Sequence, residues 1–236
     1  MVRVVRTGNS GCSETEKGAE EMMAAHSMSG VSIQKPSLAV PGIAGDGEKG
    51  YLCKNTETMI DQILTYNARF VANKEYEPYV TDKFPAKKLA VLTCMDTRLT
   101  ELLPKALGLR NGDAKIIKNA GGLVLSETDS AIRSLLVGIY ELGVQEVMVV
   151  HHSTCGACHM SYDEFKPHML ERGISPDTLA EWESKGVADW LEGFHDTEAS
   201  VRRTVDAIVN HPLVPQDVTV RGFIIDSVTG ALTEVC

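Results

Sequence analysis

The chain has 236 residues and a formal net charge of −9, and 43% of its residues are hydrophobic while 23% are charged. This balance is typical of a globular protein with a packed core, and the negative charge argues against nucleic acid as a partner because phosphate backbones would be repelled. We also expect no membrane partner, since no apolar run reaches the roughly 18 residues that span a bilayer. With no signal-peptide pattern at the N-terminus and six sparsely placed cysteines, we predict a cytoplasmic protein.

The first segment differs in composition from the rest of the chain. Residues 1–50 are rich in Gly, Ser, Glu and Ala and contain the helix breakers Pro36 and Pro41. Such a composition favours a poorly structured N-terminal extension, with a short helix around 14–25. We therefore predict that the folded domain covers 51–236.

A helix over 56–73 opens this domain, because its apolar residues recur near a helical period. Strands are then predicted over 89–93, 114–118, 145–151 and 218–225, alternating with helices over 99–107, 127–142, 175–185 and 198–210. A terminal hairpin arm is expected over 226–235. Tyr140 is expected in the core, and Trp182 and Trp190 are expected to pack between the late helices. The alternation indicates an α/β fold, in which helices cover both faces of a mainly parallel sheet.

Two groups of polar residues follow strands of this predicted sheet. Cys94, Asp96 and Arg98 come directly after the first strand, and His152 and Cys155 come directly after the third. Ligand sites of parallel sheets lie beyond the carboxyl ends of the strands, so we expect these side chains to meet. Two thiolates and an imidazole suit Zn²⁺, and three protein ligands leave a fourth position for water, whose pKa zinc lowers to about 7. The sequence therefore predicts a catalytic zinc site on Cys94, His152 and Cys155.

Asp96 and Arg98 are predicted to form an ion pair beside this metal. Arg98 would fix the carboxylate of Asp96, which would then either accept the hydrogen bond of the bound water or take the fourth position itself. A salt bridge in an exposed loop would contribute little to stability. Burying an ion pair costs desolvation energy, and a neighbouring zinc ion would explain why the pair is kept there. We therefore expect Asp96 and Arg98 to be catalytic.

These motifs resemble those of a known family. Cys-x-Asp-x-Arg is followed, 58 positions after its cysteine, by His-x-x-Cys-Gly, and the pair is similar to the signature of the β-carbonic anhydrases. The segment 112–122 resembles that family's second strand and following loop, and the similarity covers about 56–230. The resemblance implies a Rossmann-like core with a four-stranded parallel sheet plus an antiparallel edge strand, and a catalytic domain over 51–236 that hydrates CO2 to bicarbonate with Zn²⁺. It also implies a homodimer or dimer of dimers, in which the N-terminal helix grips the partner subunit.

Three departures from the family pattern leave the substrate open. His151 stands where the family usually has Gly, Thr154 where it often has Asp, and Ala157-Cys158-His159 where Met commonly follows Cys-Gly. The His-His pair also resembles relatives that hydrolyse carbonyl sulfide, so a hydrolase of carbonyl sulfide or carbon disulfide is the alternative function. In an extended strand, His151 points to the face opposite the ligand histidine, and we expect it to pack or to line the pocket edge.

Cys158 raises a further alternative, because a fourth protein ligand would close the zinc site and exclude water. With Cys155 it also makes a formal C-x-x-C redox pair, but the first of these cysteines is already assigned to the metal. The turn over 119–122 is expected to help line the pocket, and Leu123, Val124 and residues of a partner chain could supply its hydrophobic slot. Four further histidines are expected to be surface or capping residues, one of which could shuttle protons: His159, His168, His195 and His211.

Overall fold

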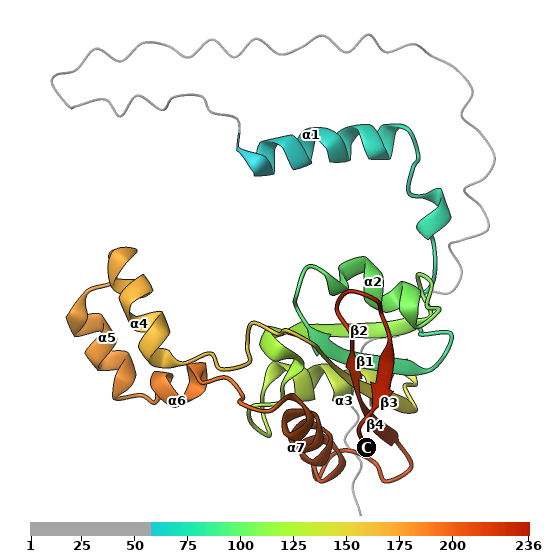
Figure 1. Cartoon of the computed structure of the whole chain (residues 1–236). Coiled ribbons are helices and arrows are strands. Elements are labelled where there is room, and N and C mark those ends of the chain that lie inside the picture. The colour runs from blue at the N-terminus through green and yellow to red at the C-terminus, as the bar shows by residue number, and fades with distance from the viewer. Residues whose placement is uncertain (1–57) are drawn as a thin grey trace, which may run out of the picture. The chain divides into compact units, whose positions relative to one another are not determined.

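The computed structural model describes residues 58–236, so the predicted extension over 1–50 and the helix around 14–25 lie outside the described residues. The described residues contain a five-stranded sheet in the order β2-β1-β3-β4-β5 (Figure 1). Its strands are β1 (Leu89–Cys94), β2 (Ala114–Asn119), β3 (Glu146–His152), β4 (Thr219–Ile225) and β5 (Leu232–Glu234). β1, β2, β3 and β4 run parallel to one another, and β5 pairs antiparallel with β4. This confirms the predicted four-stranded parallel core with an antiparallel edge strand.

β1 and β3 are the central strands, and their neighbouring ends position the site. Both strands are almost entirely buried, as expected for strands that helices cover on both faces. Thr93 pairs with Val150 in the register, and its hydroxyl donates a 2.7 Å hydrogen bond to the Val150 carbonyl. The carboxyl ends of β1 and β3 therefore lie side by side, where the sequence pattern predicted them to meet.

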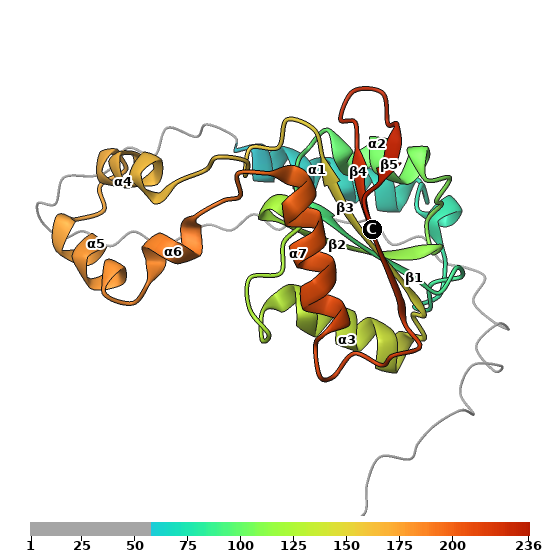
Figure 2. The ribbon, with the colours of Figure 1, turned by 60° about the horizontal axis from the view of Figure 1, so that its bottom comes forward.

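Helices cover both faces of the sheet. The α-helices are α1 (Met59–Ala72), α2 (Leu99–Ala106), α3 (Ser130–Leu142), α4 (Tyr162–Glu171), α5 (Pro176–Glu183), α6 (Val187–Leu191) and α7 (Thr197–Val209), and the 3₁₀ turns are η1 (Glu77–Tyr79) and η2 (Ala120–Gly122). α3 and α7 lie together on one face (Figure 2), where they pack against Ala90 and Leu92. Leu99 and Leu103 of α2 pack with Val91, which points to the other face. Alternate residues of β1 thus serve two separate cores.

The ends of α3 follow local sequence signals. The Asp129 carboxylate accepts a 2.9 Å hydrogen bond from the Ile132 N–H and caps the first turn, so the helix begins after the predicted residue 127. Gly143 follows the last helical residue with a φ of 72°, a left-handed conformation that glycine adopts without a Cβ clash.

α1 differs from the other long helices because none of its residues is buried. Thr58 and Asp61 form a reciprocal capping box at its start. Four apolar side chains of one face are between 57% and 69% exposed: Met59, Ile60, Ile63 and Leu64. The predicted helix is therefore present, but its apolar face packs against nothing within the described residues. None of the helices in residues 58–236 has both the length and the apolar character needed to cross a membrane.

Several details differ from the predictions. α4 and α6 were not predicted; α4 has Pro167 in its interior and weak apolar periodicity, which hides it from a pattern search. Tyr140 is exposed rather than in the core, and its hydroxyl donates to the Leu213 carbonyl at 2.9 Å. Trp182 and Trp190 are also exposed.

Candidate metal centre

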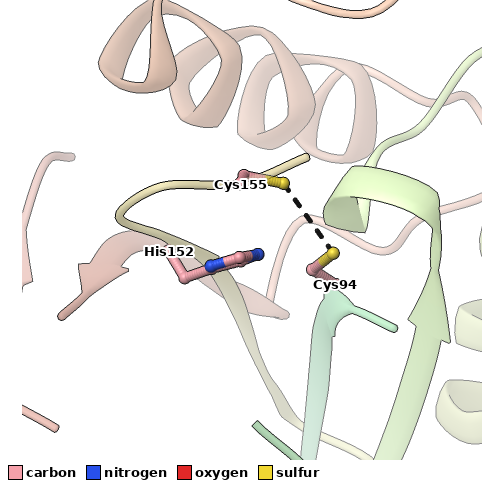
Figure 3. A group of neighbouring side chains, drawn as sticks. All are labelled: Cys94, His152 and Cys155. Carbon is pink, nitrogen blue, oxygen red and sulfur yellow. Dashed lines mark hydrogen bonds between the residues drawn. The ribbon is translucent and has the colours of Figure 1, made fainter. Parts of the chain in front are cut away.

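Cys94, His152 and Cys155 form a buried group at the carboxyl ends of β1 and β3. Cys94 is the last residue of β1, His152 is the last residue of β3, and Cys155 stands in the turn that follows. Their ligand atoms all lie within 4.8 Å of one another, and the two sulfur atoms are 3.8 Å apart (Figure 3). The structure thus brings together the three residues that the sequence selected as ligands.

The geometry of this group fits a tetrahedral zinc ion. Two sulfurs bound to one zinc ion at 2.3 Å with a tetrahedral angle would be about 3.8 Å apart, which is the separation observed between Cys94 and Cys155. His152 Nε2 is buried and has no hydrogen-bond partner, while Nδ1 lies 2.9 Å from the Ser153 carbonyl. Nδ1 therefore donates its proton to that carbonyl, which leaves the Nε2 lone pair free for a metal.

The two thiols have unequal acidity. A hydrogen bond from Cys155 lowers the pKa of the Cys94 thiol well below its usual range despite burial, and His152 and the backbone N–H groups of Asp96 and Gly121 also favour the thiolate. The pKa of Cys155 is raised by the same hydrogen bond and by burial. The pair therefore holds one negative charge, and the Cys94 thiolate is the ligand best prepared to capture a cation.

Asp96 and Arg98 form a two-pronged ion pair beside this group. Arg98 Nε and Nη2 donate to the Asp96 carboxylate at 3.0 and 2.8 Å, and the Arg98 backbone N–H donates to it at 2.8 Å. These bonds hold the pKa of Asp96 well below its usual range. Asp96 Oδ2 is 3.8 Å from His152 Nε2, so a permanent carboxylate lies next to the candidate metal position.

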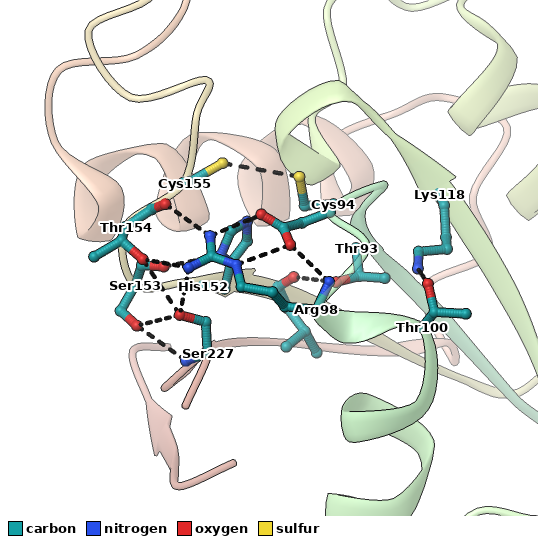
Figure 4. Close-up of polar contacts among 12 residues, drawn as sticks. Thr93, Cys94, Arg98, Thr100, Lys118, His152, Ser153, Thr154, Cys155 and Ser227 are labelled. Carbon is teal, nitrogen blue, oxygen red and sulfur yellow. Dashed lines mark hydrogen bonds and ion pairs between the residues drawn. The ribbon is translucent and has the colours of Figure 1, made fainter. Parts of the chain in front are cut away.

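Arg98 is held in turn by residues from two other segments. Nη1 donates to the hydroxyls of Thr154 and Ser227 at 2.9 and 3.2 Å, and Nη2 donates to the Thr154 carbonyl at 3.0 Å (Figure 4). The Ser227 N–H donates to Ser153 Oγ at 3.0 Å. The guanidinium therefore connects the segments that follow β1, β3 and β4, and this network fixes its orientation.

A cavity of about 460 Å³ opens beside Cys94 and the ion pair. Its lining is mainly apolar and comes from the segments after β1, β2 and β3: Cys94, Met95, Asp96, Thr97, Arg98, Ala120, Gly121, Gly156, Ala157 and Met160. The predicted contribution of the turn over 119–122 is thus present. Leu123 and Val124 pack against the two cores instead of lining this cavity.

Gly122 lets η2 approach the end of β1 directly. Its φ is 73°, and a Cβ at this position would lie 2.9 Å from the Thr93 carbonyl carbon and 3.0 Å from the Cys94 nitrogen. Only a residue without a side chain fits between these backbones. Gly122 therefore helps to fix the position of Cys94.

His151 points away from the metal group, as its place in the strand predicted. It is fully buried, its ring stacks on Phe194 with 5.7 Å between centroids, and Nε2 lies 3.2 Å from the Gly122 carbonyl. Burial lowers the pKa of His151 to about 4, so its ring is neutral at physiological pH.

Three other residues bear on the predictions about the site. Within residues 58–236, Cys158 is not among the side chains that converge with the metal group. His211 was expected to be a surface or capping residue; it is buried, with Nε2 3.0 Å from the Glu127 carbonyl. Ser227 was missed, although the rule that ligands gather beyond the carboxyl ends of parallel strands also applies to β4 and could have identified it.

Comparison with known proteins agrees with this geometry. Residues 89–232 match the carbonic anhydrase family. The Bacillus subtilis protein YvdA, provisionally named a carbonic anhydrase, is 49% identical over 183 residues, which are 77% of this chain and 93% of YvdA. The crystal structure of a β-carbonic anhydrase from Trichomonas vaginalis is similar with a TM-score of 0.69 and 32% identity, covering 75% of this chain and 97% of that one. A carbon disulfide hydrolase from Acidithiobacillus thiooxidans is 32% identical over 181 residues, which are 71% of this chain and 81% of the hydrolase.

Proposed function

The chain belongs to the β-carbonic anhydrase family, and we propose that it catalyses the zinc-dependent, reversible hydration of carbon dioxide to bicarbonate and a proton. The observation that carries this proposal is the buried group of Cys94, His152 and Cys155, with its 3.8 Å sulfur separation and its unpartnered imidazole nitrogen. The Asp96–Arg98 ion pair and the apolar cavity beside this group support it.

Cys94 and Cys155 would hold the metal as thiolates, and His152 would hold it through Nε2. Zinc with three protein ligands keeps a fourth position open and lowers the pKa of water there to about 7, which supplies a nucleophile at neutral pH. The two thiolates place negative charge in a buried site, which makes the metal a weaker Lewis acid than three neutral imidazoles would. Cys94 already favours the ionised form, so metal binding needs to remove a proton mainly from Cys155.

Asp96 would orient the nucleophile. Its carboxylate remains ionised because Arg98 lowers its pKa, so it can only accept hydrogen bonds. Oδ2 lies on the side of the carboxylate that faces His152, where it can accept the hydrogen of an attacking hydroxyl and direct the oxygen lone pair towards the cavity. Asp96 thus aligns the attacking oxygen without taking its proton.

Arg98 would keep Asp96 in this role. A carboxylate so close to the ligands could itself take the fourth position, which would stop catalysis. Arg98 grips both carboxylate oxygens, and its own contacts with Thr154 and Ser227 resist a movement of the pair towards the ligands. In the structure the carboxylate of Asp96 is bound by Arg98.

The cavity suits a small linear gas. Carbon dioxide has no charge and needs an apolar slot beside the nucleophile more than it needs hydrogen-bond donors. Met95, Ala157 and Met160 supply apolar walls close to the ligand cysteines. Bicarbonate, the product, is an anion, and Arg98 is the nearest cation that lines the cavity.

A second candidate is hydrolysis of carbonyl sulfide or carbon disulfide by the same group of ligands. It is favoured by the similarity to a carbon disulfide hydrolase and by the departures at His151 and Thr154. Thr154 bonds directly to Arg98, so that departure lies within the network that orients Asp96. Both substrates are linear and apolar, and the ligand group alone does not discriminate between them.

One experiment separates these proposals. Zinc is counted per chain in the purified protein, and CO2 hydration is followed by stopped flow from about pH 6.5 to 9 beside sulfide release from carbonyl sulfide and carbon disulfide. One zinc ion per chain and fast hydration that rises with pH support the carbonic anhydrase. Sulfide release with negligible hydration supports the hydrolase. Zinc with neither activity contradicts both.

A pair of cysteine variants tests the ligand set. Cys155→Ser should lose zinc, because it removes one of the two thiolates. Cys158→Ser should keep both zinc and activity, since Cys158 lies outside the converging group. Loss of zinc from Cys158→Ser would instead indicate a closed site with four protein ligands.

We further propose a homodimer, or a dimer of dimers, with the folded domain over 51–236 as its catalytic unit. The exposed apolar face of α1 supports contact with a second copy, because an amphipathic helix of this kind needs an apolar surface to cover it. We place the enzyme in the cytoplasm, because its six cysteines are too sparse for a disulfide scaffold and a reducing compartment keeps the ligand cysteines available to the metal. Sedimentation and cell fractionation test these two proposals.

A further inference from the structure

A pair of histidine side chains lies close together outside the site already described. His159 Nδ1 and His195 Nδ1 are 3.4 Å apart, although the residues are 36 positions apart in the sequence. Their rings are tilted by 34° with 5.6 Å between centroids, and both side chains are exposed. Two imidazole nitrogens therefore face one another at the surface.

The backbone beneath this pair is firmly held. His159 N–H donates to the Phe194 carbonyl at 2.7 Å, Phe194 N–H donates to the Ala157 carbonyl at 3.1 Å, and Gly193 N–H donates to the Met160 carbonyl at 2.8 Å. A Cβ on Gly193 would clash with the Ala157 carbonyl oxygen, so glycine is what allows the two segments to approach. Phe194 is only 2% exposed and fixes its segment in the core. The two histidines are thus presented by a preorganised frame.

The backbone of His159 is itself unusual. Its φ is 64°, in the left-handed region that residues other than glycine seldom adopt. Such conformations disfavour the fold slightly and persist where the surrounding structure enforces them, often at functional sites. Here the hydrogen bond to Phe194 enforces it, and the ring of His159 meets that of His195.

The distance between the nitrogens fits a metal better than a hydrogen bond. The 3.4 Å separation is long for a hydrogen bond donated by a nitrogen, since N–H···O bonds are about 2.7–3.2 Å long. Two nitrogens bound to one zinc ion at 2.1 Å with a tetrahedral angle would be about 3.4 Å apart, which is the distance between His159 and His195. Asp196, the nearest acid in sequence, is occupied as the cap of α7 through its bond to the Ala199 N–H.

We propose that His159 and His195 bind a divalent transition-metal ion of the Zn²⁺ class through their Nδ1 atoms, with water in the remaining positions. This ion is separate from the one at Cys94. The two histidines flank the segment 161–192 that carries α4, α5 and α6, so the metal would connect the point where the chain leaves the sheet with the point where it returns (Figure 1). The bound metal would stabilise the place where the two ends of this segment meet, and thereby the Ala157–Met160 wall of the substrate cavity.

The test is a calorimetric titration of the full-length, zinc-loaded protein with Zn²⁺ alone at about pH 7.5, where protons compete little for imidazole. We expect a second class of sites, which is weakened about a hundredfold when either histidine of the chelating pair is lost. His159→Asn removes the ring and keeps a residue that tolerates the left-handed backbone, and His195→Ala removes the other ring. His168→Ala, an exposed histidine on α4, is the matched control and should bind as the parent does.

Thermal unfolding provides a second measurement. If the two rings had only a structural role, added Zn²⁺ would not change the Tm through them. Added Zn²⁺ should raise the Tm of the parent and of His168→Ala but leave His159→Asn and His195→Ala unchanged, because only a ligand bound to the native state stabilises it. The proposal is overturned if the parent takes up no zinc beyond the catalytic equivalent. It is equally overturned if both pair variants bind and respond to Zn²⁺ like the parent, or if His168→Ala loses the site as they do.

Discussion

Replacing Gly122 by alanine tests whether η2 positions the metal ligand at the end of β1. The new Cβ would lie 2.9 Å from the Thr93 carbonyl carbon, a distance that real Cβ atoms essentially never show, and 3.0 Å from the Cys94 nitrogen, which is tighter than most real contacts. The left-handed backbone, with a φ of 73°, disfavours alanine by about 1 kcal/mol, and the overpacking against β1 adds about 2 kcal/mol. A total of about 3 kcal/mol should lower the Tm of a domain of this size by about 6–12 °C. Zinc should also be lost faster to a chelator, because Cys94 must move.

Gly143→Ala is the matched control for this prediction. Gly143 has almost the same φ, 72°, but no atom lies within 4 Å of a Cβ placed there. Only the conformational part, about 1 kcal/mol, applies to it, so its Tm should fall by about 2–4 °C and its zinc should be retained. Equal Tm shifts and equal zinc retention in the two variants would refute the idea that the contact of Gly122 with β1 fixes Cys94.

Three further predictions address the ion pair, the oligomer and the buried histidine. Arg98→Lys keeps the charge but loses the two-pronged grip on the carboxylate, so kcat/KM for CO2 should fall about 10–100-fold with zinc still bound, as stopped flow and metal analysis will measure. If the proposed dimer forms through α1, Ile63→Asp should convert it to monomers in sedimentation, whereas Gln62→Asp on the same helix should not; a dimer that survives Ile63→Asp would contradict a role for this face. Below about pH 6.5 the unfolded chain protonates His151, whereas the folded chain, in which burial lowers the pKa of this residue to about 4, does not. Stability should therefore fall by about 1.4 kcal/mol per pH unit between about pH 6.5 and 4, and chemical unfolding of His151→Gln at the same metal loading should show a flatter slope.

The sheet and the metal group could be predicted because their signals are local. The short apolar segment of β1 is recognisable without its neighbours, and Cys94 follows it directly. The rule that parallel strands present ligands at their carboxyl ends then brings Cys94 to His152 without any knowledge of side-chain contacts. The spacing of His152 and Cys155 in one turn completes the set.

Features that depend on long-range packing could not be predicted from the sequence. Tyr140 lies on an apolar stripe of α3, yet the sheet covers only part of that stripe and leaves the ring exposed. His211 resembles a surface residue in a loop, but its ring reaches the Glu127 carbonyl at the start of α3. Ser227 has no local signal beyond its place after β4, because its role comes from a bond to Arg98, 129 residues away. Such contacts are set by the topology rather than by the composition of any segment.

The structure also separates the candidate metal ligands from the residues that shape the cavity. Cys94 and His152 end adjacent strands whose register is fixed by the ladder between β1 and β3, so substitutions in loops leave their spacing unchanged. The walls of the cavity come instead from loops, through residues such as Met95, Ala157 and Met160. Loops tolerate substitution far better than a buried parallel sheet does. A change of substrate among small linear molecules can therefore arise from new wall residues while the three residues of the ligand group stay in place. In this chain the wall segment Ala157–Met160 is also the one that carries His159, so a metal bound there would act on the cavity wall without touching the three ligands.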